Sequence, residues 1–238
     1  MDAFAVPDFA ELAGGNPYVG RGIVVGLSAD GKNGVSAYFI MGRSRNSRNR
    51  VFVKKGGDLY TEPFDPSTAG DPSLIIYRAL TSIGSTLILT NGNQTDTVAE
   101  GLAAGKAFSA SLATRDFEPD APNFTPRISA ALYFEPSFSY EMSILKSADE
   151  KGSGTERFTF SYPALTGLGH FLHTYVTDGN PLPSFFGEPE RVRIPSDIDE
   201  LTSEIWQTLD GDNKISLYVR YTDLLTGRYT DRLINKNV

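Results

Sequence analysis

Short apolar segments, separated by turns of glycine, proline and polar residues, recur along this 238-residue chain. Segments 18–27 and 35–41 are rich in β-branched residues or glycine, as strands often are, and Ser-Ala-Asp-Gly at 28–31 predicts a turn that joins them into a hairpin. A strand at 51–54 follows. More strands are expected at 73–80, 85–90, 128–134, 140–146, 157–162, 214–221 and 228–233, the last two forming a hairpin around 226–227.

One helix is expected to begin at Thr97, because Glu100 three residues later completes the form of a capping box. Its apolar face would contain Val98, Leu102, Phe108 and Leu112. Glycines at 101 and 105 weaken this helix by about 1 kcal/mol each relative to alanine. Alternatively, they allow the helix to pack closely on a sheet.

A second helix is expected over 196–209, with Ser196 as its cap and Asp199 at the third position. It carries a regular apolar stripe, made of Ile198, Leu201, Ile205 and Leu209. We interpret this stripe, and the single Trp206, as core packing.

Many strands and few helices predict an α+β domain of stacked antiparallel sheets flanked by helices. Composition does not shift along the chain and no repeat is visible, so we expect a single domain over 16–238. Residues 1–15 would form a lead-in, either loosely held or folded as a short helix docked on the surface.

Four arginines in the segment GRSRNSRNR, residues 42–50, contrast with a formal net charge of −7 for the whole chain. Affinity for nucleic acid comes mostly from neutralising many phosphates, so an acidic protein is a poor general nucleic-acid binder. One local cationic cluster on an anionic body is better suited to a small anionic ligand.

The chain has no cysteine, which excludes disulfides, thiolate-bound zinc, iron–sulfur clusters and a cysteine nucleophile. Residues 1–15 are partly acidic and lack an apolar run of signal-peptide length. No apolar stretch reaches the about 18 residues that a transmembrane helix needs. The sequence predicts a soluble cytoplasmic protein with no membrane partner.

Several common sites are missing from the sequence. It has neither a GxxxxGK[ST] loop nor a GxGxxG fingerprint between a strand and a helix. His170 and His173 are three residues apart in an extended segment, so they would face opposite sides. We expect them to be structural or surface histidines rather than metal ligands. A Ser-His-Asp triad has no nucleophile-elbow motif to support it.

Three polar clusters remain as candidates for a site. They are the arginine loop at 42–50, NGNQTDT at 91–97, and FEPDAPNFTPR at 117–127, which holds Glu118, Asp120 and Arg127. Each alone has a structural explanation, as a solvated loop, a turn with a helix cap, or a proline-rich loop. Together they indicate a site that binds a small anion beside carboxylates.

These motifs, with Tyr18-Val19-Gly20-Arg21, occur in the order found in the archaeal-type inosine monophosphate (IMP) cyclohydrolase family. Over residues 16–135 the chain resembles that family, in a longer, bacterial-type branch. NGNQTDT matches the family's NG-x-x-TDT. The family's arginine loop reads SSRSFPNR, and here only its flanking arginines match. Of the family's N-x-Y-x-x-Y segment, only the last tyrosine, Tyr77, is retained.

The resemblance implies a four-layer αββα sandwich similar to the N-terminal nucleophile hydrolase fold, with two stacked antiparallel sheets between helices. Hydrolases of that class carry a Cys, Ser or Thr at the start of the first strand. Here Pro17 and Tyr18 stand in that position. We therefore do not expect the amidohydrolase mechanism of that class.

The resemblance also implies a reaction, the dehydrative ring closure of 5-formamidoimidazole-4-carboxamide ribotide to IMP, which ends de novo purine synthesis. The implied catalytic residues are Glu118 and Tyr77. The phosphate would bind Arg43 and Arg48, helped by Arg21, whereas Arg45 and Arg50 fall outside the family pattern and are expected to be surface charges. Base and ribose would be oriented by Asn91, Asp96, Asn123 and Arg127.

The implied enzyme belongs to the cyclic amidine hydrolases and needs no metal or organic cofactor. Its partner would be the purine ribotide, and a homo-oligomer is compatible with the sequence. Two alternatives stay open. The chain is a non-catalytic purine-nucleotide-binding relative, or an amide hydrolase of the N-terminal nucleophile type that uses Ser28 or another hydroxyl.

Overall fold

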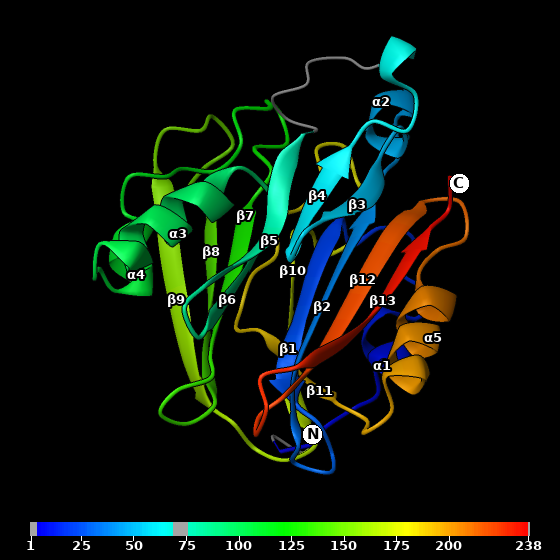
Figure 1. Ribbon diagram of the computed structural model, residues 1–238. Coiled ribbons are helices and arrows are strands. Elements are labelled where there is room, and N and C mark those ends of the chain that lie inside the picture. Colours follow the sequence, from blue (N-terminus) through cyan, green and yellow to red (C-terminus); the bar gives the residue numbers. More distant parts are fainter. Residues whose placement is uncertain (1–3, 69–75, 238) are drawn as a thin grey trace.

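The computed structural model describes residues 4–68 and 76–237, and in this part of the chain two antiparallel sheets lie between helices (Figure 1). The first sheet has the order β11-β10-β1-β2-β12-β13. Its strands are β1 (Arg21–Leu27), β2 (Asn33–Met41), β10 (Leu168–His173), β11 (Glu190–Arg193), β12 (Lys214–Asp223) and β13 (Tyr229–Asn235).

The second sheet follows the order of the sequence, β3 to β9. It consists of β3 (Val51–Lys55), β4 (Asp58–Glu62), β5 (Tyr77–Ile83), β6 (Thr86–Thr90), β7 (Arg127–Tyr133), β8 (Ser139–Ser147) and β9 (Thr155–Pro163). All neighbouring strands are antiparallel, and the expected hairpins β1–β2, β8–β9 and β12–β13 are confirmed. The sequence did not predict β4, β11 or the extent of β10. Residues 73–75 of the expected strand at 73–80 lie outside the described residues.

Three apolar clusters separate four layers. Side chains that alternate along each strand point to opposite faces, so Ile23 and Val25 enter the layer between the sheets while Val24 faces the helices. α1 (Phe9–Ala13) and α5 (Ile198–Thr208) cover the first sheet; α3 (Gln94–Ala103) and α4 (Phe108–Ser111) cover the second (Figure 1). The expectation of stacked antiparallel sheets with few helices is confirmed.

The short helix α1 is held firmly by its first residue. Phe9 is fully buried, with its ring centroid 5.9 Å from that of Phe39 and 5.0 Å from that of Phe171. Of the two interpretations of residues 1–15, the docked short helix is confirmed for residues 9–13.

The start expected for the helix at Thr97 is wrong. α3 begins three residues earlier, at Gln94, and Thr97 lies inside it. Its length is also shorter than expected, because Gly105 adopts φ +75° and Phe108 belongs to the separate α4. Gly101 allows close packing, but on Ser111 of α4 rather than on a sheet.

The cap expected for the later helix is shifted by one residue. Asp197, not Ser196, precedes α5, and its carboxylate accepts the backbone N–H of Asp199 at 2.7 Å. The apolar stripe is confirmed as core, with Leu201 and Ile205 fully buried.

Residues near the end of the described chain connect the two sheets. The Asn235 side chain accepts the backbone N–H of Phe52 at 2.8 Å and donates to the Phe52 carbonyl at 3.0 Å. Asn237 donates to the Arg48 carbonyl at 2.8 Å. Through these bonds, β13 supports both β3 and the loop that precedes it.

Candidate functional site

A cavity of about 470 Å³ opens at one end of the layer between the sheets; we call it the arginine-loop pocket. Several elements meet there, namely the start of β1, the loop before β3, the loop before β7 and the segment after β10. The side chains or backbone of Tyr18, Arg21, Arg43, Ser44, Ser47, Arg50, Glu118, Asp120, Asn123, Thr125, Tyr175 and Leu182 surround it.

The floor of this pocket consists of Arg21, Arg50 and Glu118, which are 8%, 6% and 5% exposed. Nε of Arg21, and Nε and Nη1 of Arg50, are buried without a hydrogen-bond partner in the described part of the chain. Buried charged groups are normally paired. Two guanidinium groups against one carboxylate leave an excess of positive charge in the floor.

Burial controls the electrostatics of the floor. Burial raises the pKa of Glu118, while Arg21 and Arg127 oppose that rise. Burial and the neighbouring Arg21 charge lower the pKa of Arg50. Burial acts in the same direction on Arg21, but Glu118 and nearby tyrosines outweigh it and raise the pKa of Arg21. Glu118 is therefore a carboxyl group suited to exchanging protons at a higher pH than an exposed glutamate.

Behind the floor, Gly92 leaves space for the side chains around Glu118. A Cβ at this position would lie 2.5 Å from Arg127 Nη1, 2.6 Å from Gln94 Oε1 and 3.5 Å from Glu118 Oε1. Arg127 Nη1 donates to Gln94 Oε1 at 2.8 Å, and Gln94 is fully buried. This glycine lets the Arg127 guanidinium and the Gln94 amide pack near the Glu118 carboxyl, and the Arg127 charge opposes the rise in the pKa of Glu118.

Tyr77 also lies behind the floor and is not among the side chains that surround the cavity. Its hydroxyl is 2.8 Å from that of Tyr38, and both residues are buried. Burial, with Tyr77 as neighbour, raises the pKa of Tyr38 well above its usual range. Burial lowers the pKa of Arg127, and Glu118 and Tyr77 oppose that fall. Tyr77 also helps to raise the pKa of Arg21, so it belongs to the same electrostatic cluster.

One wall of the pocket is aromatic. The rings of Tyr18 and Tyr175 stack with centroids 5.9 Å apart, and burial raises the pKa of Tyr175 to about 12. The Thr125 hydroxyl bridges the Tyr175 hydroxyl and the Asp120 carboxylate. A planar ring could lie against this wall with polar groups at its edge.

The opposite part of the wall is held by Asn123. Its Oδ1 accepts the backbone N–H of Leu182 at 3.0 Å, which ties the loop before β7 to the segment after β10. Phe124, the next residue, has φ 43°, a value in the left-handed region that non-glycine residues rarely adopt.

The rim of the pocket consists of Arg43, Ser44 and Ser47, at the start of the short helix α2 (Arg45–Arg48). Arg43 donates to the Asp178 carboxylate and, at 2.8 Å, to the Gly179 carbonyl, and it lies 5.2 Å from the Tyr18 ring centroid. Ser44 and Ser47 cap the helix reciprocally. The rim is thus a partly exposed cation beside two hydroxyls.

A family model described as "IMP cyclohydrolase-like protein" matches residues 18–227. The chain belongs to the IMP cyclohydrolase-like family. Its similarity to that family, inferred from four motifs, is confirmed, and the match extends well beyond residues 16–135.

Curated relatives of the chain carry the name IMP cyclohydrolase. The one from Methanococcus aeolicus is 30% identical over 162 residues, which cover 66% of this chain and 74% of that protein. That from Methanopyrus kandleri is 34% identical over 116 residues, 47% of this chain and 57% of the relative. The relative from Methanocaldococcus jannaschii is 36% identical over 119 residues, which cover 48% of this chain and 56% of that protein. The last two alignments span little more than half of the relatives. Membership of the longer, bacterial-type branch stays a prediction.

The family motifs lead to the pocket only in part. Of the residues expected in the site, Arg21, Arg43, Glu118 and Asn123 border the pocket, while Tyr77 and Arg127 lie directly behind it. Sequence reasoning missed the tyrosine wall, Gln94 and Arg50. Arg50 is the clearest correction, because the sequence interpretation as a surface charge is wrong, and the side chain is buried in the floor. Arg45 is exposed, as expected.

Three expected residues do not border the pocket. Arg48 is exposed and donates to the Gly42 carbonyl and, at 2.9 Å, to Asn213 Oδ1. The Asn91 side chain joins β6 to β7, donating to the Pro126 carbonyl and accepting the Ile128 N–H. Asp96 pairs with Arg78 on the outside of α3. NGNQTDT therefore shapes the pocket from behind rather than from its surface.

The two histidines face opposite sides of β10, as expected. His170 Nδ1 is 2.7 Å from the Tyr140 hydroxyl between the sheets, and burial lowers the pKa of His170 to about 4. His173 Nδ1 is 2.7 Å from the Tyr175 carbonyl, and its Nε2 is 3.2 Å from Glu190. Within residues 4–68 and 76–237, His, Asp and Glu side chains form no group of three able to hold a metal ion. Among the same residues, no helix is long and apolar enough to cross a membrane.

Proposed function

We propose that this protein is an IMP cyclohydrolase, which closes the purine ring of 5-formamidoimidazole-4-carboxamide ribotide and releases water. The observation that carries the proposal is the floor of the pocket, where a buried carboxyl lies among excess buried guanidinium groups in a member of this family. The reaction needs a proton acceptor beside groups that stabilise negative charge on oxygen.

The chemistry is an addition followed by a dehydration. The carboxamide nitrogen attacks the formyl carbon, a C–N bond forms, and the formyl oxygen becomes a hydroxyl. That hydroxyl then leaves as water, as the formamido nitrogen gives up its proton and a C=N bond forms. Both reacting groups belong to one molecule, and well-oriented intramolecular reactions reach effective molarities of about 10⁵–10⁸ M. Orientation and proton transfer supply the acceleration without a cofactor.

Glu118 takes a proton from the carboxamide nitrogen and gives it to the formyl oxygen, which becomes the hydroxyl. It then takes the proton of the formamido nitrogen and gives it to this hydroxyl, which leaves as water. Its buried position raises its pKa, which suits a group that must both accept and donate protons. Gln94 and Gly92 support this role, because they position Arg127 near the carboxyl group, whose charged form Arg127 stabilises.

Arg21 and Arg50 stabilise the negative charge that develops on the formyl oxygen. Their unpaired buried N–H groups are oriented before the substrate arrives, so little reorganisation accompanies the reaction. Tyr77 lies behind the floor with its hydroxyl paired to that of Tyr38, so it supports the charge of Arg21 rather than contacting this oxygen.

The ribotide extends from floor to rim. Its imidazole ring stacks against Tyr18 and Tyr175, and its 5′-phosphate binds Arg43 with the hydroxyls of Ser44 and Ser47. Arg48 is left out of the phosphate site, because its guanidinium is engaged outside the pocket. Asn123 orients the ribose side. Asn91 and Asp96 have supporting positions only.

Finer expectations from the sequence belong to the same proposal. The stacked sheets and helices are consistent with an N-terminal nucleophile hydrolase-like fold that has lost its nucleophile. A purine-synthesis enzyme of this kind would work in the cytoplasm, with the ribotide as its partner and without nucleic acid. Homo-oligomer formation is a separate prediction, testable by light scattering.

The decisive experiment supplies purified protein, without added cofactor, with the formamido ribotide and follows the ultraviolet change of ring closure. Turnover by the wild type and its loss in Glu118→Gln are expected, with Asp96→Asn as a control carboxylate outside the pocket. If wild-type protein binds IMP but does not turn over the ribotide, the protein is a non-catalytic relative and the proposal fails.

A further inference from the structure

A second cavity, of about 310 Å³, lies between the two sheets at the end opposite to the arginine-loop pocket. β12 begins beside Asn213, which contacts the arginine loop, and ends at Asp223, which borders the second cavity. β7 likewise runs from Arg127, behind the floor, toward Phe134 in the wall of the second cavity. At about 3.3 Å per residue, these strands separate the cavities by roughly 20–30 Å.

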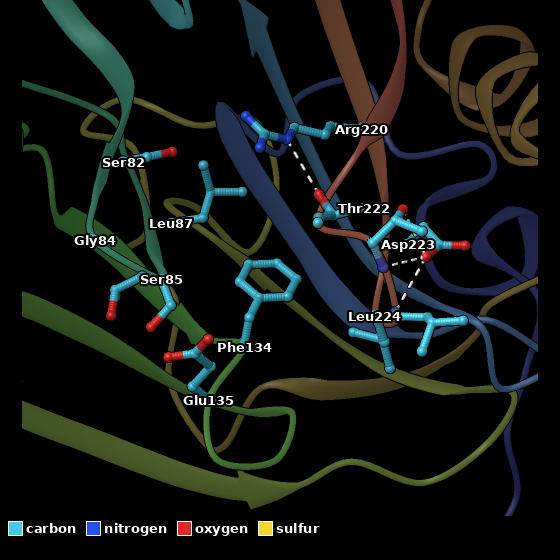
Figure 2. A pocket seen from close by; sticks show the side chains of 14 residues that line it. Ser82, Gly84, Ser85, Leu87, Phe134, Glu135, Arg220, Thr222, Asp223 and Leu224 are labelled. Atoms are coloured by element: carbon cyan, nitrogen blue, oxygen red, sulfur yellow. Dashed lines mark hydrogen bonds between the residues drawn. The ribbon is translucent and has the colours of Figure 1, made fainter.

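Arg220 projects from β12 toward the facing sheet and borders this cavity (Figure 2). It is only 7% exposed. Its Nε donates to Thr222 Oγ1 at 3.1 Å, and the Tyr229 ring covers one face, 3.7 Å from the guanidinium carbon to the centroid. In the described part of the chain, no carboxylate forms an ion pair with Arg220. Burial lowers its pKa, which Tyr218, Tyr229 and Asp231 oppose only in part.

A buried guanidinium without an ionic partner is expensive in the interior of a protein. The stacked tyrosine satisfies one face of the group, the threonine hydroxyl satisfies one of its donors, and a side-chain hydrogen bond with Tyr218 uses another. The rest of the guanidinium borders the cavity. An anion in that cavity would complete the coordination of Arg220.

The rest of the lining restricts which anion fits. Leu87 and Phe134 supply an apolar surface from the facing sheet (Figure 2). The lining also contains two acidic residues, Glu135 and Asp223. The Asp223 carboxylate accepts the backbone N–H groups of Leu225 and Thr226, so it does not neutralise Arg220. Glu135 is exposed. Because one cation lies among two acidic groups, the cavity favours a ligand with a single negative charge over a phosphate dianion.

We propose that this Arg220 cavity is a binding site for a small organic monocarboxylate. The carboxylate pairs with Arg220, and the apolar part of the ligand packs on Leu87 and Phe134. The site is independent of the function proposed for the arginine-loop pocket, since it shares no residue with that pocket.

Isothermal titration of the whole protein with benzoate tests the site, with benzamide as the neutral isostere and inorganic phosphate as the dianion. Benzoate is expected to bind saturably, and benzamide is not. Phosphate is expected to bind only at the arginine-loop pocket, and therefore equally in the wild type and in Arg220→Gln. Arg220→Gln should weaken benzoate binding by about tenfold or more, because charge-assisted hydrogen bonds are lost. Arg228→Gln, an exposed arginine on the same hairpin, is the matched control and should bind as the wild type does.

Glu135→Gln keeps the test informative if the Arg220 variant does not fold. This exposed residue makes no hydrogen bond within the described chain, and removing its charge should tighten benzoate binding by about twofold. Arg43→Ala should not change benzoate binding, since it alters only the other pocket. The proposal is overturned if benzoate does not bind, if benzamide binds as tightly as benzoate, if phosphate binding is lost in Arg220→Gln, or if benzoate binds equally to a folded Arg220→Gln protein.

Discussion

The floor and the rim of the arginine-loop pocket use the same residue type in opposite ways. Arg21 and Arg50 in the floor are buried, and three of their nitrogens have no partner in the described chain. Arg43 in the rim is partly exposed and already paired with Asp178 and the Gly179 carbonyl. Buried charges are weakly screened and fixed in place, whereas exposed pairs exchange with water and salt. The floor is therefore built for chemistry and the rim for reversible binding.

Both regions draw on one loop of nine residues. Arg43 supplies the rim and Arg50 the floor, while Arg45 and Arg48 face away from the pocket. The role of each arginine in this loop therefore depends on its position in the loop relative to the start of β3. If floor and rim differ as we infer, substitutions in them should affect different kinetic constants.

Replacing Glu118 by glutamine should produce the largest effect. The amide keeps the shape of the side chain but cannot exchange the proton, so kcat should fall by about 10²–10⁴-fold while KM changes little. Steady-state kinetics of ring closure measures both constants. Asp96→Asn should stay close to the wild type, and a kcat for Glu118→Gln within a few fold of wild type would contradict the assignment.

A methyl group at Gly92 should disturb the floor without removing any charge. Its Cβ would press on Arg127, Gln94 and Glu118, and a displacement of about 1 Å in a catalytic geometry can cost about 10²-fold in rate. Gly92→Ala should lower kcat/KM by about that factor. Gly57→Ala is the control, because a Cβ there meets no atom within 4 Å. Equal activity of the two variants would mean that the contact with Arg127 does not matter.

Arg50→Gln and Arg48→Gln compare floor and exterior within one loop. Loss of charge-assisted hydrogen bonds of about 1.5–3 kcal/mol should lower kcat/KM of the Arg50 variant by about 10–100-fold. The Arg48 variant should retain wild-type kinetics. Thermal unfolding is the check on structure, since Nε and Nη1 of Arg50 have no hydrogen-bond partner among the described residues and the loss of its charge should not lower Tm. Equal losses in both variants would refute the distinction.

Arg43→Ala should raise KM by about tenfold, the loss of one charged contact, with little change in kcat. Asp178→Asn should have the opposite and smaller effect on KM, because it frees Arg43 for the phosphate. Increasing salt should raise KM in the wild type and less so in Arg43→Ala. A change confined to kcat would mean that Arg43 takes part in the chemical step rather than in phosphate binding.

The smallest expected effect concerns stability and pH. Burial raises the pKa of Glu118 in the folded state, so the folded protein holds this proton to higher pH than the unfolded chain does. The favourable contribution of the neutral carboxyl is present below the unfolded pKa and is lost as pH rises through the folded pKa. Relative to the wild type, Glu118→Gln should gain Tm as the pH rises above about 4.5. A difference in Tm that is constant with pH would contradict this.

Much of the framework could be read from local patterns. The β1–β2 and β12–β13 hairpins, α1 and α5 all follow from short-range features, namely turn glycines and the spacing of apolar residues. β4 was missed because this five-residue strand, Asp58–Glu62, is short, charged at both ends, and includes only Leu59 and Tyr60 as apolar or aromatic side chains. The capping-box form at Thr97 misled because the same residues also occur inside a helix that starts at Gln94.

The site was less predictable because contacts between residues far apart in the sequence decide which charged side chains enter the pocket. Nothing in GRSRNSRNR distinguishes Arg50, which turns inward, from Arg48, which bonds Asn213 far away in the sequence. Tyr175 reaches the pocket from fifty residues beyond Thr125, with which it shares a hydrogen bond. Family motifs identified Glu118 and Arg21, but they could not show that Asn91 serves the backbone of β7 rather than a ligand.

The two hydrogen bonds between the Asn235 side chain and the Phe52 backbone have a consequence for folding during synthesis. During synthesis, the arginine loop leaves the ribosome long before the residues that support it, which are 183 and 189 positions later. Contacts of such long range form late in folding. A nascent chain therefore carries the arginine loop without its final support, and ligand binding should begin only after residues 235–237 have emerged. Activity would then require this late segment, so that translation products truncated before it do not compete for substrate.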